Sequence, residues 1–174
     1  MTELAASCDK LKTVLITEEK VRKALGRMRG DKAPGADDMS PRLLVMIADY
    51  IVEPLCNIYS CSMADGVVPV DWKRANVCPA HKKGSRAKAD NYRPISLTSQ
   101  LCKVFEFIMR DELVSHLEKL HLIYETQHGF RVGRSCLSNL LTFLEKATKV
   151  LNDGLCLDVI YLDLAKAFDK VSHK

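Results

Sequence analysis

Residues 155–169 read Leu-Cys-Leu-Asp-Val-Ile-Tyr-Leu-Asp-Leu-Ala-Lys-Ala-Phe-Asp, and this stretch decides the predicted fold. The part from Leu155 to Leu162 is almost continuously apolar and carries one charge. It is too short for a separate helix, and a strand buried on both faces is apolar throughout rather than alternating. We therefore predict a buried central strand from Leu155 to Leu162, with Asp163 at the point where the strand ends.

The carboxylate of Asp163 needs a physical explanation at the end of such a strand. Removing an ionised carboxylate from water costs several kcal/mol, unless the group is exposed at an edge or neutralised by a cation. Two interpretations remain open from the residues alone. Asp163 binds a metal ion, or it caps the turn or helix that follows.

Four helices are predicted upstream of this strand. Thr17 caps the first, which ends near Gly30, and Ser40 with Pro41 begins the second, which continues to about residue 64. Pro54 lies inside the second pattern and predicts a kink or two shorter helices. The third helix covers about residues 101–120, and Ser135 caps a fourth that runs to about residue 151. The apolar positions of the first three patterns are Val21, Leu25, Met28, Leu44, Ile47, Ile51, Leu55, Ile58, Tyr59, Leu101, Val104, Phe105, Ile108, Leu113, Leu117 and Leu120.

Two extended runs, at residues 76–80 and 92–97, flank a polar segment and predict a β-hairpin with a basic tip. Residues 66–110 carry nine Lys and Arg against three Asp and Glu, a local net charge of +6, whereas the whole chain has +4. We expect this surface to bind RNA and DNA weakly and without sequence preference. The polar segment 31–38 contains Pro34 and Gly35, which indicate a tight turn between helices.

Composition excludes several classes of protein. The chain has 174 residues and 47% hydrophobic content, enough for one globular core or slightly more. Asp49 and Glu53 interrupt the most apolar segment, so we expect no membrane span. The first residues show neither a basic nor an apolar leader region, so we expect an intracellular protein that is not secreted.

Seven cysteines, an odd number, occur without any C-x-x-C pair, which predicts free thiols with no disulfide partner in a reducing compartment. Zinc is not expected for the same reason. His116 and His121 are interpreted as ordinary helix residues.

Six blocks of the sequence, in order, resemble the reverse transcriptases of LINE-type (non-LTR) retrotransposons, particularly the jockey-like group. The blocks are residues 31–37, 71–77, 82–84, 91–98, 127–131 and 161–169. Their co-occurrence is more specific than any single block. In the first block, Ala36 and Asp38 stand where a proline and a glycine are common in the family, and the block suggests no mechanical role.

The resemblance implies an α+β fold with the fingers subdomain of a right-hand polymerase and an incomplete palm. Residues 1–70 would form a helical N-terminal extension, residues 71–154 the fingers with the basic hairpin, and residues 155–174 the start of the palm with its first strand. A second catalytic block with two adjacent aspartates does not follow Asp163 in this sequence. We therefore expect a truncated polymerase and no primer extension by this chain alone.

The resemblance also assigns candidate roles. Asp163 corresponds to the first catalytic carboxylate, a ligand of two Mg²⁺ ions, and Phe168 to the ring that selects dNTPs over rNTPs, although ordinary core packing remains an alternative for Phe168. Arg93, with Lys82 or Lys83, corresponds to the residues that clamp the incoming triphosphate, while a generic solvated loop remains an alternative for Lys83. The last candidates, Arg131 and Arg134, would contact the template backbone.

The function implied is that of an RNA-directed DNA polymerase that uses an RNA template, a DNA primer, dNTPs and Mg²⁺ in the cytoplasm and nucleus. Two alternatives remain open. One is a non-catalytic nucleic-acid-binding remnant or host-adopted fragment, and the other is a relic without function.

Overall fold

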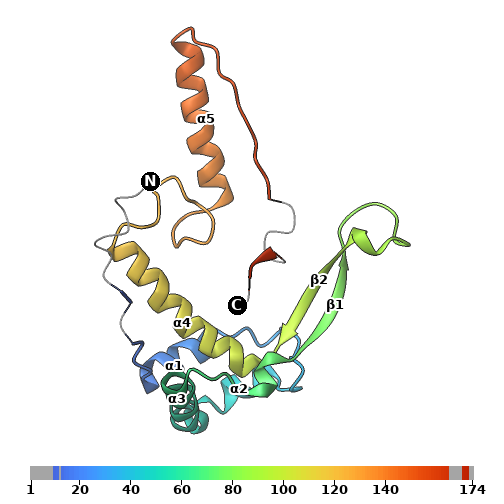
Figure 1. The fold of residues 1–174 in the computed structure, drawn as a ribbon, viewed down its shortest axis with the longest axis vertical. Helices are drawn as coiled ribbons and strands as arrows, with labels where there is room; N and C mark the ends of the chain where they lie inside the picture. Colours follow the sequence, from blue (N-terminus) through green and yellow to red (C-terminus); the bar gives the residue numbers. More distant parts are fainter. Residues whose placement is uncertain (1–9, 12, 165–169, 173–174) are drawn as a thin grey trace. The chain divides into compact units, whose positions relative to one another are not determined.

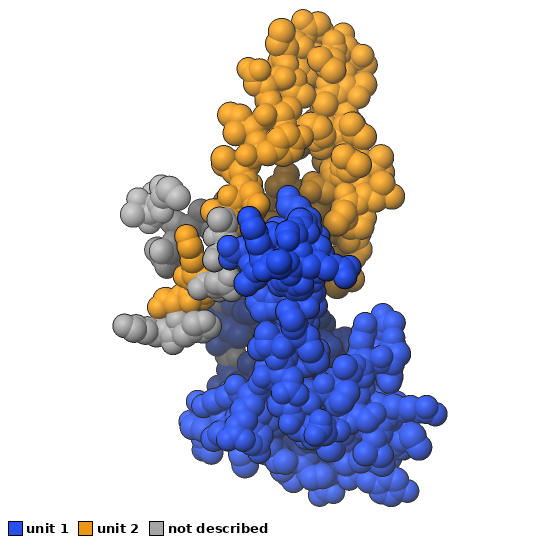
Figure 2. Space-filling model, turned by 90° about the vertical axis from the view of Figure 1, so that its right-hand side faces the viewer, with its two compact units in different colours: residues 1–122 blue, residues 123–174 orange. Residues whose placement is uncertain are grey.

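The computed structural model describes residues 10–11, 13–164 and 170–172. The chain divides into two compact units, residues 1–122 and 123–174, which Figure 2 colours separately. The first unit contains α1 (Glu18–Gly26), α2 (Pro41–Met46), α3 (Ala48–Asp65), the 3-10 turn η1 (Val70–Lys73), β1 (Ala75–His81), η2 (Ala89–Asn91), β2 (Tyr92–Thr98) and α4 (Gln100–Lys119). The second contains α5 (Cys136–Asn152). The mixture of helices with a small antiparallel sheet agrees with the coarse α+β prediction.

The core of the first unit forms where α1 packs against α3 and α4 (Figure 1). Tyr59 of α3 is fully buried at its centre and packs against the rings of Trp72 and Phe105, which also contact each other. The ring centroids lie 5.5 Å and 5.0 Å away, and the Tyr59 hydroxyl donates a hydrogen bond to the backbone carbonyl of Leu101 at 2.8 Å. This aromatic group joins α3, η1 and α4, so it ties the start of the hairpin to the helices.

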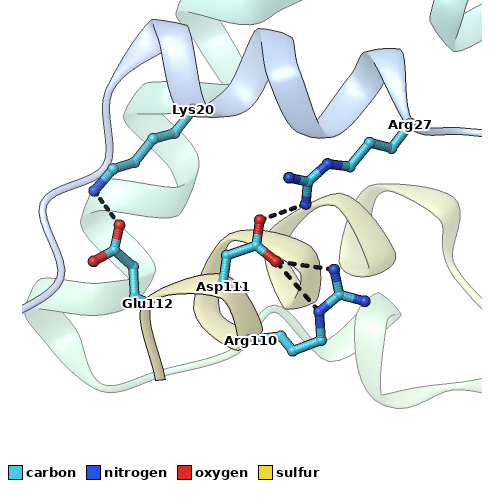
Figure 3. A network of polar contacts seen from close by, with 5 residues as sticks. All are labelled: Lys20, Arg27, Arg110, Asp111 and Glu112. Atoms are coloured by element: carbon cyan, nitrogen blue, oxygen red, sulfur yellow. Dashed lines mark hydrogen bonds and ion pairs between the residues drawn. The ribbon is translucent and has the colours of Figure 1, made fainter. Parts of the chain in front are cut away.

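A network of ion pairs joins the exposed sides of α1 and α4, as Figure 3 shows. Lys20 and Glu112 are 2.6 Å apart, and Asp111 accepts hydrogen bonds from both Arg27 and Arg110. Burial, the largest single influence, raises the pKa of Asp111, but the two arginines together outweigh it and hold that pKa below the ordinary value.

The helix starts agree with the predictions. The Thr17 hydroxyl accepts from the amide of Lys20, Pro41 is the first residue of α2, and Ser135 forms a capping box with Ser138 at the start of α5. The first helix, however, ends at Gly26 instead of near Gly30. Its last turn tightens there, since the amides of residues 27 and 28 bond carbonyls three residues back.

Pro54 does not break the second helical segment. The break falls at Ile47, between α2 and α3, and Pro54 lies inside α3. The carbonyl that loses its amide partner to Pro54 belongs to Tyr50, and both residues are exposed, so the missing hydrogen bond falls on the solvent side of α3. Among the predicted core positions, Ile58 and Leu113 are exposed, whereas Val52, which the pattern missed, is buried.

The prediction of a central strand from Leu155 to Leu162 is wrong. Residues 155–162 belong to no helix or strand, and all of them are exposed. A strand requires a neighbour for its backbone hydrogen bonds, and the sheet of the described residues consists of β1 and β2 alone. The apolar sequence of this segment is therefore present without the sheet that would bury it.

Membrane spans and disulfides are absent from the parts of the chain that the structure describes. No helix in these ranges combines the length and apolarity needed to cross a bilayer. Six described cysteines are free thiols: Cys56, Cys61, Cys78, Cys102, Cys136 and Cys156. Burial is the largest cause that raises the pKa of Cys102 to about 11, with the nearby carboxylate of Glu106 adding to it.

Candidate functional site

The predicted hairpin is confirmed, and it presents the candidate cations on an exposed ribbon. β1 and β2 pair antiparallel, with Ala75 opposite Thr98 at the open end and His81 opposite Tyr92 near the tip. Arg93 lies opposite Ala80. Because side chains alternate between the two faces of a strand, Lys82, two residues after Ala80, shares the face of Arg93. The amide of Lys82 extends the pairing by donating to the Asn91 carbonyl at 2.8 Å. The candidates Lys82 and Arg93 are thus brought together on one face.

The tip of the hairpin, residues 82–91, is ordered by its own hydrogen bonds. The side-chain amide of Asn91 donates to the carbonyl of Ser85 at 2.7 Å, and the Tyr92 hydroxyl donates to the carbonyl of Arg86 at 2.9 Å. These contacts fold residues 85–89 back toward the second face of the ribbon, so Arg86 lines a cavity of about 570 Å³ with Tyr92. Arg86 and Arg93 therefore occupy different sides of the hairpin.

His81 and Gly84 complete the tip. The ring nitrogen Nε2 of His81 lies 3.1 Å from the Gly84 carbonyl, and the His81 and Tyr92 rings meet edge to face at 5.3 Å. Gly84 has a φ of 82°, a conformation that favours glycine. The sequence blocks 82–84 and 91–98 include Gly84 and Tyr92, but the sequence did not indicate a supporting role for them or for His81, because that role depends on contacts that only the folded loop creates.

The charge of the tip and of the adjoining Arg93 is uncompensated. Residues 82–93 carry five cations against one acidic residue, Asp90. All five cations are exposed, and none forms an ion pair with another described residue: Lys82, Lys83, Arg86, Lys88 and Arg93. A ligand that supplies several negative charges in a short span would complement this surface.

The remaining candidates lie in the second unit. Arg134 is exposed in the loop before α5, and a guanidinium nitrogen of Arg131 donates to the Tyr124 carbonyl at 3.3 Å. The loop is anchored by the buried His128, whose Nδ1 lies 2.8 Å from the Ser138 hydroxyl. The structure brings Arg131 and Arg134 into one loop.

Asp163 is exposed in the irregular segment after α5. Within the described ranges, no group of three or more His, Cys, Asp or Glu is placed to hold a metal ion. A single exposed carboxylate supplies one oxygen ligand group, whereas Mg²⁺ requires near-octahedral coordination. The described residues therefore do not by themselves fit the expected metal site. Phe168 lies outside the described residues.

These motifs and the hairpin point to one class of protein, the nucleotide polymerases that copy a template. The chain belongs to the reverse transcriptase (RNA-dependent DNA polymerase) family, whose model matches residues 80–174. The resemblance to jockey-like, non-LTR retrotransposon polymerases is confirmed by the relatives.

Three relatives illustrate the similarity. The chain is 28% identical over 159 residues to the RNA-directed DNA polymerase from mobile element jockey of Drosophila melanogaster, and this covers 91% of the chain and 17% of that relative. It is 26% identical over 159 residues to the probable RNA-directed DNA polymerase from transposon BS of the same species, covering 91% and 18%. The Transposon TX1 uncharacterized 149 kDa protein of Xenopus laevis is 27% identical over 159 residues, covering 91% and 12%. The chain thus spans less than a fifth of the length of these proteins.

Proposed function

We propose that the hairpin of this chain binds the triphosphate of an incoming dNTP, as part of an RNA-directed DNA polymerase that copies an RNA template onto a DNA primer. The observation that carries this proposal is the position of Arg93 and Lys82 on one face of an exposed ribbon without ion-pair partners. Arginine offers a planar fork to phosphate oxygens, and lysine a mobile point charge. Lys83, next in the chain, would add a second point charge.

The other assignments follow family membership. Residues 1–70 would be a helical N-terminal extension, residues 71–154 the fingers, and residues 155–174 the start of the palm. Arg131 and Arg134 would contact template phosphates, which position the strand without reading its sequence. The full polymerase would act in the cytoplasm and nucleus.

Asp163 and Phe168 belong to the catalytic block by the same reasoning. Asp163 would supply one carboxylate to divalent ions, most simply Mg²⁺, which stabilise the charge that develops during phosphoryl transfer. Phe168 would select dNTPs over rNTPs. Residues beyond the described ones would have to complete the metal ligands.

Titration of the ¹⁵N-labelled chain with dATP tests the proposed triphosphate site. We expect the largest amide shifts at Lys82, Lys83 and Arg93, and weaker binding of dAMP than of dATP. Loss of a charge-assisted contact costs about 1.5–3 kcal/mol, so Arg93→Gln should weaken dATP binding about tenfold or more.

Arg86→Gln is the matched control, because it removes the same charge from the same hairpin, on the side opposite to Arg93. We expect less than about a twofold loss of affinity for this variant. Equal losses for Arg86→Gln and Arg93→Gln would show that only net charge matters, and this would overturn the assignment of a triphosphate site to the Arg93 face.

A further inference from the structure

The segment between α1 and α2, residues 31–38, has a defined structure that its sequence did not explain. We call it the 31–38 loop. The amide of Asp38 donates to the Gly35 carbonyl at 3.2 Å, and the Asp37 carboxylate accepts from the amide of Met39 at 3.3 Å. Gly35 itself is buried, although its neighbours Pro34 and Ala36 are exposed. The turn therefore points one backbone position into the protein.

Gly35 lies directly against the backbone where β2 ends and α4 begins. A Cβ atom at position 35 would lie 2.3 Å from the carbonyl oxygen of Thr98 and 2.7 Å from the amide nitrogen of Ser99. Both are backbone atoms, which cannot rotate away as a flexible side chain would. Gly35 does not have a positive φ, so the requirement for glycine comes from space and not from backbone conformation. Any side chain here would force the loop and the junction apart.

A buried hydrogen bond fixes the same two segments. Gln100, which is 3% exposed, donates from Nε2 to the carbonyl of Ala33 at 2.7 Å, across 67 positions of sequence. The adjacent Ser99 is 1% exposed and caps α4 by accepting from the amide of Cys102. The junction is thus held by a close backbone contact and a hydrogen bond, both supplied by the 31–38 loop.

The position of this contact in the hairpin gives it a mechanical consequence. Thr98 is the last residue of β2 and pairs with Ala75, the first of β1, so the contact at Gly35 lies at the open end of the hairpin. Beside it lies a cavity of about 340 Å³ whose lining includes Met28, Leu97 and Phe107. This pocket opens to solvent and leaves one side of the junction without side-chain packing, so the contacts at Gly35 and Gln100 supply more of the constraint on the hairpin.

We propose that the 31–38 loop is a latch that sets the direction in which the hairpin leaves the helical core, with Gly35 and Gln100 as positioning residues. This inference rests on the proposed function in one respect: the side chains positioned are Lys82, Lys83 and Arg93. Side chains that bind a triphosphate must hold it within a narrow range of positions relative to the reacting groups, because a displacement of about an ångström lowers the reaction rate strongly. The latch supplies this accuracy from a site that carries no chemistry of its own.

Residual dipolar couplings of the ¹⁵N-labelled chain test the latch, since they report the orientation of each element. In the wild type, we expect the couplings of β1, β2, α1, α3 and α4 to fit one alignment tensor. In Gly35→Ala, the helices should still fit together, while the hairpin couplings become at least about twofold smaller. Gly26→Ala is the matched control, because no atom lies within 4 Å of a Cβ built at that position.

Gln100→Leu gives a second, milder variant. It replaces the amide that donates to the Ala33 carbonyl with an apolar side chain of similar volume. It should reduce the hairpin couplings in the same direction, and it carries the test if Gly35→Ala does not fold. Unchanged hairpin couplings would overturn the latch. A parallel loss in hairpin and helices would also overturn it, because the loop would then merely stabilise the core.

Titration with inorganic tripolyphosphate separates this inference from the proposed function. The tip is ordered by its own hydrogen bonds, so we expect Gly35→Ala to bind tripolyphosphate within about twofold of the wild type. Failure of the wild type to bind tripolyphosphate would refute the triphosphate site, but it would not affect the conclusion drawn from the residual dipolar couplings. A large loss of binding in Gly35→Ala would show that the loop acts on the tip itself, against a latch that sets direction alone.

Discussion

Tyr59→Phe removes one hydroxyl from the centre of the core and leaves the ring. The hydroxyl is fully buried and donates to the Leu101 carbonyl at 2.8 Å. A buried neutral hydrogen bond contributes about 0.5–1.5 kcal/mol, and the helical carbonyl at the acceptor keeps its backbone partner. We therefore expect the free energy of unfolding to fall by about 1 kcal/mol, which corresponds to a roughly fivefold larger unfolding constant.

The assay is urea unfolding followed by tryptophan fluorescence. Trp72 is the single tryptophan of the chain, and its ring centroid lies 5.5 Å from that of Tyr59, so its emission reports the core directly. Tyr50→Phe is the matched control, since Tyr50 is 84% exposed and should lose almost nothing. If the two variants lose the same stability, the buried hydrogen bond does not contribute as we argue.

The wild type and Tyr59→Phe can also be compared as a function of pH. Burial, with a smaller effect of Cys102, raises the pKa of Tyr59 well above its ordinary value of 10.0. The unfolded chain therefore ionises Tyr59 first as pH rises, and the folded state loses stability above pH 10. Phenylalanine cannot ionise, so the advantage of the wild type over Tyr59→Phe should shrink above pH 10. A constant difference from pH 7 to pH 11 would refute the raised pKa.

Three further outcomes are expected. Asp111→Asn should lower the free energy of unfolding by at most about 1 kcal/mol at pH 7, because the Asp111 carboxylate is 40% exposed. The difference from the wild type should shrink below pH 4 as wild-type Asp111 takes up its proton, and denaturant titrations at several pH values check this. Ser135→Ala removes the capping box of α5 and should lower helix content by circular dichroism, with a stability cost near 1 kcal/mol; unchanged helicity would contradict the role of the cap. Binding of single-stranded RNA should weaken with salt at a logarithmic slope of roughly −3 to −4, and reversing the charges of Lys82, Lys83 and Arg93 should flatten it; an unchanged slope would place the binding surface elsewhere.

Local signals predicted the helices and the hairpin well. Caps at Thr17 and Ser135, and the alternation of extended runs around a basic tip, depend on neighbours within a few residues, so they are readable from sequence. The break at Ile47 was not readable. Pro54 is the conspicuous residue there, but its missing hydrogen bond is tolerated on an exposed side of α3.

The misplaced strand at residues 155–162 shows the limit of an apolar pattern. Apolarity predicts burial only where a sheet exists to receive the segment, and the described residues provide no neighbour strand for it. The role of Gly35 was missed for a related reason. A tight turn was predicted from Pro34 and Gly35, whereas the contact that requires glycine lies more than sixty positions away, at Thr98.

The first unit separates the residues that fold the chain from those proposed to act. Its buried residues gather on the helices around Tyr59, while both faces of the hairpin remain largely exposed. An exposed two-stranded ribbon is only marginally stable alone, so it needs support at its ends. The support is local at the tip, through Asn91 and Tyr92, and distant at the base, through Gly35 and Gln100. The cations that we propose to bind a triphosphate thus lie outside the core, on a ribbon that is supported at both of its ends.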